Sequence, residues 1–481
     1  MSQKPILSGM RWTVYTSVLR RLLTLVLFYF VARWLSREDL GVFREYSLIL
    51  ALLALLAGFS LDFHYIIEQK HTRTAFYAMW QISIISALVG SLLLTFLSGW
   101  LGTLYKSPLL ADVLRYTSIF LGIEIIRRAV RSVAAKHKQF KQLALAETYN
   151  VVFYCLVTVA GLAFIRSLWI YILAFYLGNL LETLYLWLCN KREIHSLLRG
   201  RILRLGILLK VWRRQAGFSL QATLVSVVNT FSGNAPVLFL GTLVNPLSIG
   251  LYYFASQLVG VPVGTFTTAV NQVFFPVFAE QRDKDIAALS GRYLRLAGWL
   301  GLPLLLLFTY LGMLLTAWLF STKWMDAIPL LPPMFLLFGS SLYVNPISGI
   351  PFVKRKPGWE LTWNLAGLGL KLLAMLWGLR ISFLMAIWAF SLSSVLVNLA
   401  FFLMAMHLVG CNLRQVTLRM ALSLLPAVAY ALILLPISSM PALPAALAAC
   451  GGCLLLLLSV NFLSQGKLHS DLRLILMPSH T

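Results

Sequence analysis

Charged side chains interrupt several long apolar runs of this 481-residue sequence. A charge at the centre of a bilayer costs about 2.5–3.5 kcal/mol on insertion scales, so each such residue is a candidate functional group. Arginine binds phosphate through two parallel hydrogen bonds, and lysine binds it as a point charge. The candidate cations are Arg20, Arg21, Arg127, Arg128 and Lys371. We expect them to line a cavity that accepts an anion, for which a diphosphate is a good candidate.

Arg20 and Arg21 stand eight and nine residues into the first apolar run. That distance is about 12–14 Å along a helix, and adjacent positions differ by about 100° around its axis. At least one of the two should therefore face the protein interior, unless both side chains extend back to the inner interface. Lys371 lies twelve residues into a later run, near the expected midplane of the membrane.

Carboxylates in the same apolar runs could pair with these cations or carry a coupling proton or cation. They are Asp62, Glu124, Glu147 and Glu182. Glu124 precedes Arg127 and Arg128 by three and four residues, a spacing at which helical side chains pair. The sequence leaves both roles open. Arg44 and Glu45, near the outer end of the second run, are interpreted as an interfacial ion pair.

Signatures of catalysis and of metal binding are missing from the sequence. It contains no P-loop, no histidine cluster with metal-ligand spacing and no nucleophile motif. We therefore expect no catalytic residue, no metal site and no cofactor.

The composition indicates that lipid surrounds much of the protein. Apolar residues make up 59% of the chain and charged residues 12%, against about 45–50% and 25% in soluble domains. The mean hydropathy is +0.82. A net charge of +24 would suggest nucleic acid in a soluble protein. Here Lys and Arg lie between apolar runs, as the positive-inside rule predicts, so no nucleic-acid partner is expected.

Apolar runs of about 20 residues, the length that spans a bilayer, predict an all-α membrane protein with about fourteen transmembrane helices. With the N-terminus in the cytoplasm, 27 of the 40 Lys and Arg residues fall in inside segments and 7 in outside segments, which also places the C-terminus in the cytoplasm. The expected span cores are 12–35, 42–67, 76–100, 113–134, 143–165, 168–189, 215–244, 251–279, 293–320, 328–353, 359–379, 383–407, 417–437 and 442–463.

The spans group into two lobes. We expect a first lobe at 1–190, a basic cytoplasmic linker at 191–214, a second lobe at 215–407, and an extra helix pair with a cytoplasmic tail at 408–481. The linker has an amphipathic pattern and is expected to lie in the membrane surface.

Two short segments, 35–43 and 244–252, resemble each other at an offset of 209 residues. Six spans separate them, and an even number gives both copies the same orientation. This pattern predicts a parallel repeat, which in transporters places the substrate at the interface of two bundles.

Residues 32–43 resemble the A-R-x-L-[SG]-x-x-[DE]-[FLY]-G-x-[FY] signature of polysaccharide transporters in the multidrug/oligosaccharidyl-lipid/polysaccharide exporter superfamily. Gly250, Tyr252, Ala255, Pro262 and Pro276 resemble the second-half pattern of the same family. With the span count, the resemblance covers essentially the whole chain.

The resemblance implies two six-helix lobes around a central cavity, alternating access, and flipping of an undecaprenyl-diphosphate-linked oligosaccharide to the outer leaflet, as O-antigen flippases do. It implies a bacterial cytoplasmic (inner) membrane and, as a possible partner, the polysaccharide polymerase machinery. Arg20 and Arg21 stand where related flippases carry basic cavity residues. The driving energy would come from an ion gradient or from consumption of the substrate elsewhere.

Two other functions are compatible with the sequence. A drug or organic-cation antiporter of the same superfamily would favour net-acidic cavity walls. A membrane-bound glycan polymerase or ligase generally needs a sizeable outside loop, and the outside loops expected here have a dozen residues or fewer.

Overall fold

The computed structural model describes residues 4–58, 61–67, 72–198, 213, 220, 223–224, 226–280, 283–348, 350–353 and 357–463. Every regular element in these ranges is a helix, which confirms the predicted all-α fold. Ten helices in the described part are long and apolar enough to cross a membrane. The chain divides into two compact units, Met1–Gly250 and Leu251–Thr481. The lobe boundaries expected at 190, 215 and 407 stay a prediction.

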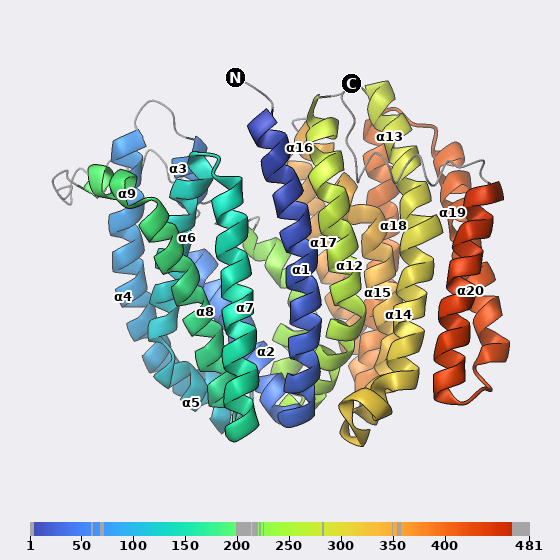
Figure 1. Cartoon of the computed structure of the whole chain (residues 1–481), viewed down its shortest axis with the longest axis horizontal. Coiled ribbons are helices and arrows are strands. Elements are labelled where there is room, and N and C mark those ends of the chain that lie inside the picture. Colours follow the sequence, from blue (N-terminus) through green and yellow to red (C-terminus); the bar gives the residue numbers. More distant parts are fainter. Residues whose placement is uncertain are drawn as a thin grey trace. The chain divides into compact units, whose positions relative to one another are not determined.

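Long helices build the first unit (Figure 1). Its core includes Tyr65, Phe76, Met79 and Val130, which are all buried together. α7 lies alongside both α1 and α8, and α4 packs on α5 and α6. The helices are α1 (Lys4–Trp34), α2 (Arg37–Gly58), α3 (Leu61–Ile67), α4 (Thr72–Leu104), α5 (Pro108–Tyr116), α6 (Ile119–Lys136), α7 (Phe140–Phe164), α8 (Leu168–Cys189), α9 (Lys191–Leu198), the π-helical η1 (Pro236–Leu240) and α11 (Gly241–Leu243).

The span expected at 113–134 is not one helix, because the chain turns between α5 and α6. Ser107 caps α5 by accepting a hydrogen bond from the amide of Leu110. At the other end, the Thr117 hydroxyl donates to the carbonyl of Val113, and the Ser118 hydroxyl accepts from Thr95 at 2.8 Å. Hydroxyl side chains offer the backbone such alternatives to a helix, and apolarity alone does not reveal them.

The second unit contains most of α12 (Pro246–Glu280) and the helices that follow it. The spans expected at 293–320 and 328–353 are interrupted by π-helical stretches at 296–301 and 316–320 and by 3-10-helical stretches at 322–330 and 345–347. Pro329 and Pro346 lie in the two 3-10-helical stretches, and each lacks a backbone donor. The elements are α13 (Asp283–Arg295), η2 (Leu296–Gly301), α14 (Leu302–Leu315), η3 (Thr316–Phe320), η4 (Thr322–Leu330), α15 (Leu331–Val344), η5 (Asn345–Ile347), α16 (Ile350–Val353), α17 (Pro357–Leu379), α18 (Phe383–Leu408), α19 (Leu413–Ile437) and α20 (Ala442–Leu463).

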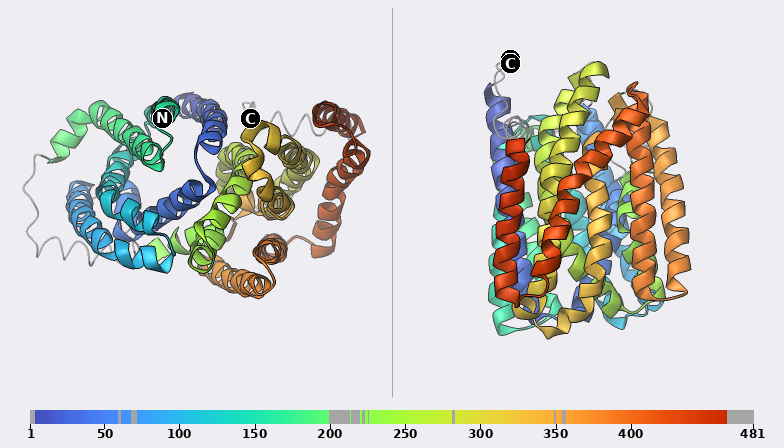
Figure 2. Two further views of the ribbon diagram at one scale, coloured as in Figure 1. Left: turned by 90° about the horizontal axis from the view of Figure 1, so that it is seen from below. Right: turned by 90° about the vertical axis from the view of Figure 1, so that its right-hand side faces the viewer.

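The last two helices, α19 and α20, both pack against α14 (Figure 2). That they form an extra pair outside two lobes stays a prediction. The Tyr430 hydroxyl of α19 donates to the Ala449 carbonyl of α20 at 2.8 Å, and both residues belong to one buried cluster.

Fourteen spans are not confirmed by the described residues. The expected spans beyond the ten lie at α1, α6 and α17, which are helical but carry charged residues, and at 215–244. The beginning of 215–244 lies largely outside the described residues. Within the expected linker, α9 is helical, and 199–212 lie outside the described residues.

The two copies of the repeated segment form matching helix starts. Ser36 and Asp39 cap α2, with the Asp39 carboxylate accepting from the Ser36 amide at 3.0 Å and the Asp39 amide donating to the Ser36 hydroxyl at 3.0 Å. At positions 209 residues later, Asn245 caps α12 by accepting from the Ser248 amide at 3.0 Å. Side-chain oxygens thus satisfy amides that the first turn of a helix leaves free.

These two helix starts touch through glycines within the first unit. A Cβ added to Gly41 would lie 1.9 Å from the Pro246 carbonyl oxygen, and one added to Gly250 would lie 1.8 Å from the Arg37 carbonyl oxygen. Gly41 and Gly250 are equivalent in the repeat, and so are Arg37 and Pro246. The contact is therefore reciprocal, with local two-fold symmetry. We call these four residues the glycine crossing.

Candidate functional site

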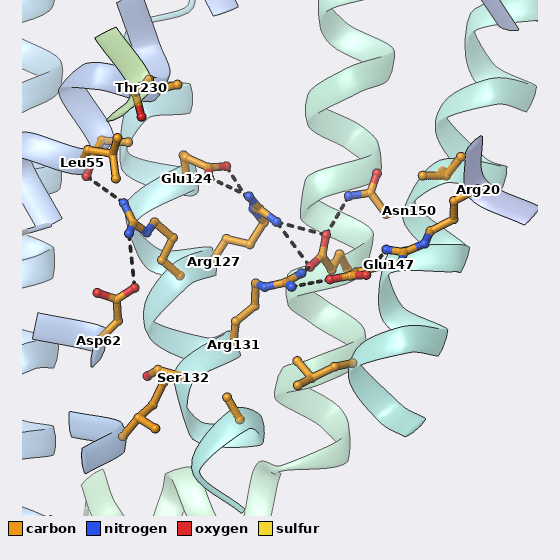
Figure 3. A pocket seen from close by; sticks show the side chains of 18 residues that line it. Arg20, Leu55, Asp62, Glu124, Arg127, Arg131, Ser132, Glu147, Asn150 and Thr230 are labelled. Carbon is orange, nitrogen blue, oxygen red and sulfur yellow. Dashed lines mark hydrogen bonds and ion pairs between the residues drawn. The ribbon is translucent and has the colours of Figure 1, made fainter. Parts of the chain in front are cut away.

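A cavity of about 700 Å³ in the first unit collects charged side chains from five helices (Figure 3). The helices α1, α3, α6, α7 and α8 supply these charges, and α2 adds apolar residues. The charged lining residues are Arg20, Asp62, Glu124, Arg127, Arg128, Arg131, Glu147 and Glu182.

Helical periodicity on α6 explains half of this set. Glu124, Arg127 and Arg131 follow one another at spacings of three and four residues, so they share one face of the helix. Arg127 binds Glu124 through two hydrogen bonds, of 2.9 Å from Nε and 2.6 Å from Nη2. Arg128 is rotated by about 100° from Arg127 and therefore points to another neighbour.

Glu182 on α8 is the buried centre of the network, with 1% of its side chain exposed. It accepts hydrogen bonds from Arg127 at 3.2 Å, from Asn150 at 2.7 Å and from Arg131. A buried carboxylate is tolerated only when its oxygens are paired in this way. Asn150 also donates to Asn179 at 2.9 Å, which links α7 to α8.

Arg131 joins Glu182 to Glu147, and Glu147 in turn pairs with Arg20 of α1. The ion pairs thus form one continuous chain across four helices: α6, α8, α7 and α1 (Figure 3). Arg20 also donates from Nε to the Thr16 carbonyl at 3.1 Å. A separate pair joins Arg128 to Asp62 of α3 at 3.3 Å.

Four arginines and four carboxylates line the cavity, so their formal charges cancel. Each arginine has at least one carboxylate partner. The cavity is therefore internally neutralised, and an anion that enters must replace a carboxylate as the partner of an arginine.

Seven of the expected site residues meet in this cavity, and two do not. Arg21 is exposed and is not among the lining residues. Lys371 lies half-buried on α17 of the second unit, and no hydrogen bond or ion pair joins it to another described residue. The roles of both stay predictions.

Arg131 and Asn150 line the cavity but were not among the expected site residues. Arg131 follows Arg127 by four residues, and this shared helical face was the available signal. Arg131 stands near the end of the expected span 113–134, where an arginine can extend its side chain to the membrane interface, and it was not counted among the candidate cations. Asn150 carries no charge, so nothing in the sequence distinguished it from other polar residues of the spans.

The interpretation of Arg44 and Glu45 as an ion pair is wrong. Arg44 donates to Asn234 at 2.5 Å. Glu45 is fully buried, and neither of its carboxyl oxygens has a hydrogen-bond partner among the described residues. Adjacent residues of a helix do not face each other, so neighbouring opposite charges need not pair.

Aromatic side chains of α2, α6, α7 and α8 form a set of ring contacts beside the cavity residues of the same helices. Phe120 stacks on Tyr176 with ring centroids 4.0 Å apart, and Tyr176 approaches Tyr46 at 6.3 Å. Tyr154 stacks on Tyr171 at 5.8 Å. Within the described residues, no group of His, Cys, Asp or Glu side chains could hold a metal ion.

Long apolar helices around a paired polar cavity define a multi-pass membrane protein of the transporter type. Residues 30–329 match the model of the family described as Polysaccharide biosynthesis protein. The chain belongs to this family, which confirms the resemblance found in the sequence.

Two relatives match most of the chain. The teichuronic acid biosynthesis protein TuaB of Bacillus subtilis (strain 168) is 22% identical over 385 residues, covering 77% of this chain and 76% of that protein. The lipopolysaccharide biosynthesis protein WzxC of Escherichia coli (strain K12) is 22% identical over 425 residues, covering 85% and 82%.

Two solved structures share the fold. The lipid II flippase MurJ in an inward closed conformation matches with a TM-score of 0.68 at 12% identity, over 94% of this chain and 98% of that one. An inward-facing multidrug resistance MATE family transporter of the MOP superfamily matches with a TM-score of 0.60 at 12% identity, over 82% and 96%. The chain therefore has the fold of these transporters.

Proposed function

We propose that the chain is a flippase that moves an undecaprenyl-diphosphate-linked oligosaccharide from the inner to the outer leaflet, for the synthesis of a cell-surface polysaccharide such as O-antigen. The observation that carries the proposal is the arginine-lined cavity in a chain of the polysaccharide biosynthesis family. The named relatives act in teichuronic acid and lipopolysaccharide biosynthesis, and one protein of the same fold is a lipid II flippase.

The diphosphate of such a substrate would bind by exchange of ion partners. Arg127 and Arg131 each contact two carboxylates, so each can release one and bind a phosphate oxygen while keeping the other. Guanidinium groups bind phosphate and carboxylate with the same paired geometry. An exchange of this kind keeps every charge in the cavity partnered at each step, which holds down the cost of burial.

Alternating access would carry the bound head group past the aromatic side chains of α2, α6, α7 and α8. The proposed setting is the bacterial cytoplasmic (inner) membrane, with both termini in the cytoplasm and the polysaccharide polymerase machinery as a possible partner. The chain would act as a transporter and not as an enzyme. The equal number of positive and negative side chains in the cavity argues against an organic-cation antiporter, which would favour a net-acidic site.

Adjacent arginines provide a matched test of the cavity. Replacing Arg20 by Gln should reduce flipping of the lipid-linked oligosaccharide by about 10–100-fold, because an arginine–phosphate contact is a charge-assisted hydrogen bond worth about 1.5–3 kcal/mol. Arg21→Gln, one residue away and exposed, should leave the rate within about twofold, as expected for a surface position. The measurement is the rate at which the lipid-linked oligosaccharide reaches the outer leaflet.

The deletion strain is the test of the function itself. In cells that lack this chain and any redundant flippase, the lipid-linked precursor should accumulate in the inner leaflet. Normal delivery of the precursor to the outer leaflet in that strain would refute the flippase proposal. Equal losses in the Arg20 and Arg21 variants, at equal membrane levels, would instead refute the assignment of the cavity.

A further inference from the structure

Glu45 is the one acidic residue of α2 that lies inside the first unit without a partner. Its side chain is fully buried, and neither carboxyl oxygen forms a hydrogen bond with a described residue. A carboxylate in such a place would lack both water and a counter-charge, and burial strongly disfavours that state. The geometry therefore requires a neutral carboxylic acid at this position.

The acid lies one helical turn from the glycine crossing, because Glu45 follows Gly41 by four residues. It packs against Gly241, whose added Cβ would lie 2.8 Å from Glu45 Oε1. Gly241 follows directly on η1, and η1 packs on α2. The segment that covers the carboxyl thus belongs to the chain leading into α12.

Two hydrogen bonds hold this covering segment in place. The Tyr105 hydroxyl donates to the Leu238 carbonyl at 3.2 Å, and Lys106 donates to the Leu243 carbonyl at 3.3 Å. Both acceptors are backbone carbonyls of the segment, and both donors follow the end of α4. If the segment separated from α2, water could reach Glu45 from the end of the first unit where α2 begins, at Arg37.

We propose that Glu45 is a proton-binding site that couples protonation to opening at the glycine crossing. With the segment 236–250 seated on α2, the acid is neutral and sealed. When the segment lifts away, the acid meets water and releases its proton. The proposal rests on the transport function above, since it supplies the coupling ion for that cycle.

Among the described residues of the elements packed on α2, no charged group pairs with Glu45. Asp112 and Arg115 on α5 are exposed, and η1 contains no titratable side chain. On α6 and α8, Glu124 pairs with Arg127 and Tyr176 approaches Tyr46.

Two titratable side chains, those of Arg44 and Tyr105, lie beside Glu45. Arg44, next to Glu45 on α2, directs its guanidinium to Asn234. Tyr105 lies against Gly241 beside the carboxyl. Burial raises the pKa of Tyr105 to about 12, so its hydroxyl stays protonated through the physiological range and Glu45 is the group that titrates.

The sign of the pH dependence follows from the number of bound protons. The closed form holds one proton more than the open form at Glu45, so low pH favours the closed form and rising pH favours the open form. For one linked proton the ratio of closed to open molecules falls by up to about tenfold per pH unit.

Cross-linking measures this ratio in the full-length chain without any substrate. Lys106 and Leu243 are both exposed and touch in this structure. They should separate when the segment lifts away, so cysteines at these positions would report closure. The five native cysteines are first replaced by serine. A short bifunctional thiol reagent is then applied at a series of pH values between about 5 and 8, the range in which proteins tend to be most stable. The cross-linked fraction should fall as the pH rises. In Glu45→Gln it should stay high and independent of pH.

Glu38→Gln is the matched control, because Glu38 is an exposed acid at the start of the same helix. It should show the pH dependence of the unchanged chain. Infrared difference spectra should contain the carbonyl band of a protonated carboxyl group in the unchanged chain, and Glu45→Asp should shift that band while Glu45→Gln removes it.

Two results would overturn the proposal: cross-linking that does not respond to pH in the unchanged chain, or a pH response that survives in Glu45→Gln. Both are read without a flipping assay. If the Glu45-dependent response is present but no lipid-linked oligosaccharide moves, the proton site stands and the proposed function fails.

Discussion

Replacing Glu182 by Gln is expected to lower the free energy of unfolding by about 2–4 kcal/mol. Glu182 is buried and accepts from two arginines, and removing one member of a buried ion pair costs about 3–5 kcal/mol. The expected loss is somewhat smaller because Arg127 keeps Glu124 and Arg131 keeps Glu147. Reversible unfolding in detergent or bicelles measures it.

Glu193→Gln provides the comparison for this change. Glu193 pairs with His137 at 3.0 Å, but 43% of its side chain is exposed, and exposed ion pairs contribute about 0–1 kcal/mol. A loss for Glu182→Gln no larger than that for Glu193→Gln would show that the network does not hold α6, α7 and α8 together.

Replacing Gly41 by Ala is expected to destabilise the closed arrangement of the glycine crossing. The new methyl group would lie 1.9 Å from the Pro246 carbonyl oxygen, and a backbone atom cannot rotate away as a side chain can. Overpacking costs about 1–3 kcal/mol, which shifts a two-state equilibrium about 5–150-fold. The ratio of closed to open molecules reported by cross-linking between cysteines at 106 and 243 should fall by that factor, and the flipping rate should fall with it.

Gly99→Ala separates this effect from a general response to an added methyl group. No atom lies within 4 Å of the position where its Cβ would be, and alanine favours a helix over glycine by about 0.5–1 kcal/mol. The variant should be as stable as the unchanged chain or slightly more so. If Gly41→Ala cross-links as well as Gly99→Ala, the crossing is not closed by the contact described above.

The sequence predicted which charged residues belong to the cavity better than it predicted which of them form ion pairs. The cost of charges in lipid singled out Arg20, Arg127 and Glu182 without reference to any structure. The spacing of Arg20 and Arg21 required one of them to face inward, but the rotation of α1 depends on its packing against α7. That packing is a tertiary property, so the sequence could not choose between the two arginines.

Two errors have a common physical cause. Arg131 was left out of the candidate cations because it stands near the end of its expected span, and Glu45 was paired with its neighbour Arg44. Both inferences used position along the chain. On a helix, partners are three or four residues apart or lie on another element. The true partners of Arg131 are on α7 and α8, and the environment of Glu45 is set by a segment that includes Gly241, 196 residues later in the chain.

The helix boundaries were also predicted only in part. Apolar runs located the long helices of both units, since twenty apolar residues have few alternatives in a membrane. At the turn between α5 and α6, the Thr117 hydroxyl donates to the Val113 carbonyl and the Ser118 hydroxyl accepts from Thr95. Such local hydrogen bonds are invisible to hydropathy and became apparent only in the folded chain.

The symmetry of the glycine crossing bears on how many codons encode its two glycines. A reciprocal contact of this kind is the one that two identical chains make across a two-fold axis. In a homodimer of half-length chains, a single codon would provide both glycines, and a mutation in it would break both sides at once. In the present chain two codons encode them, at positions 41 and 250. Each side can therefore be changed alone, and the contribution of each half can be measured separately.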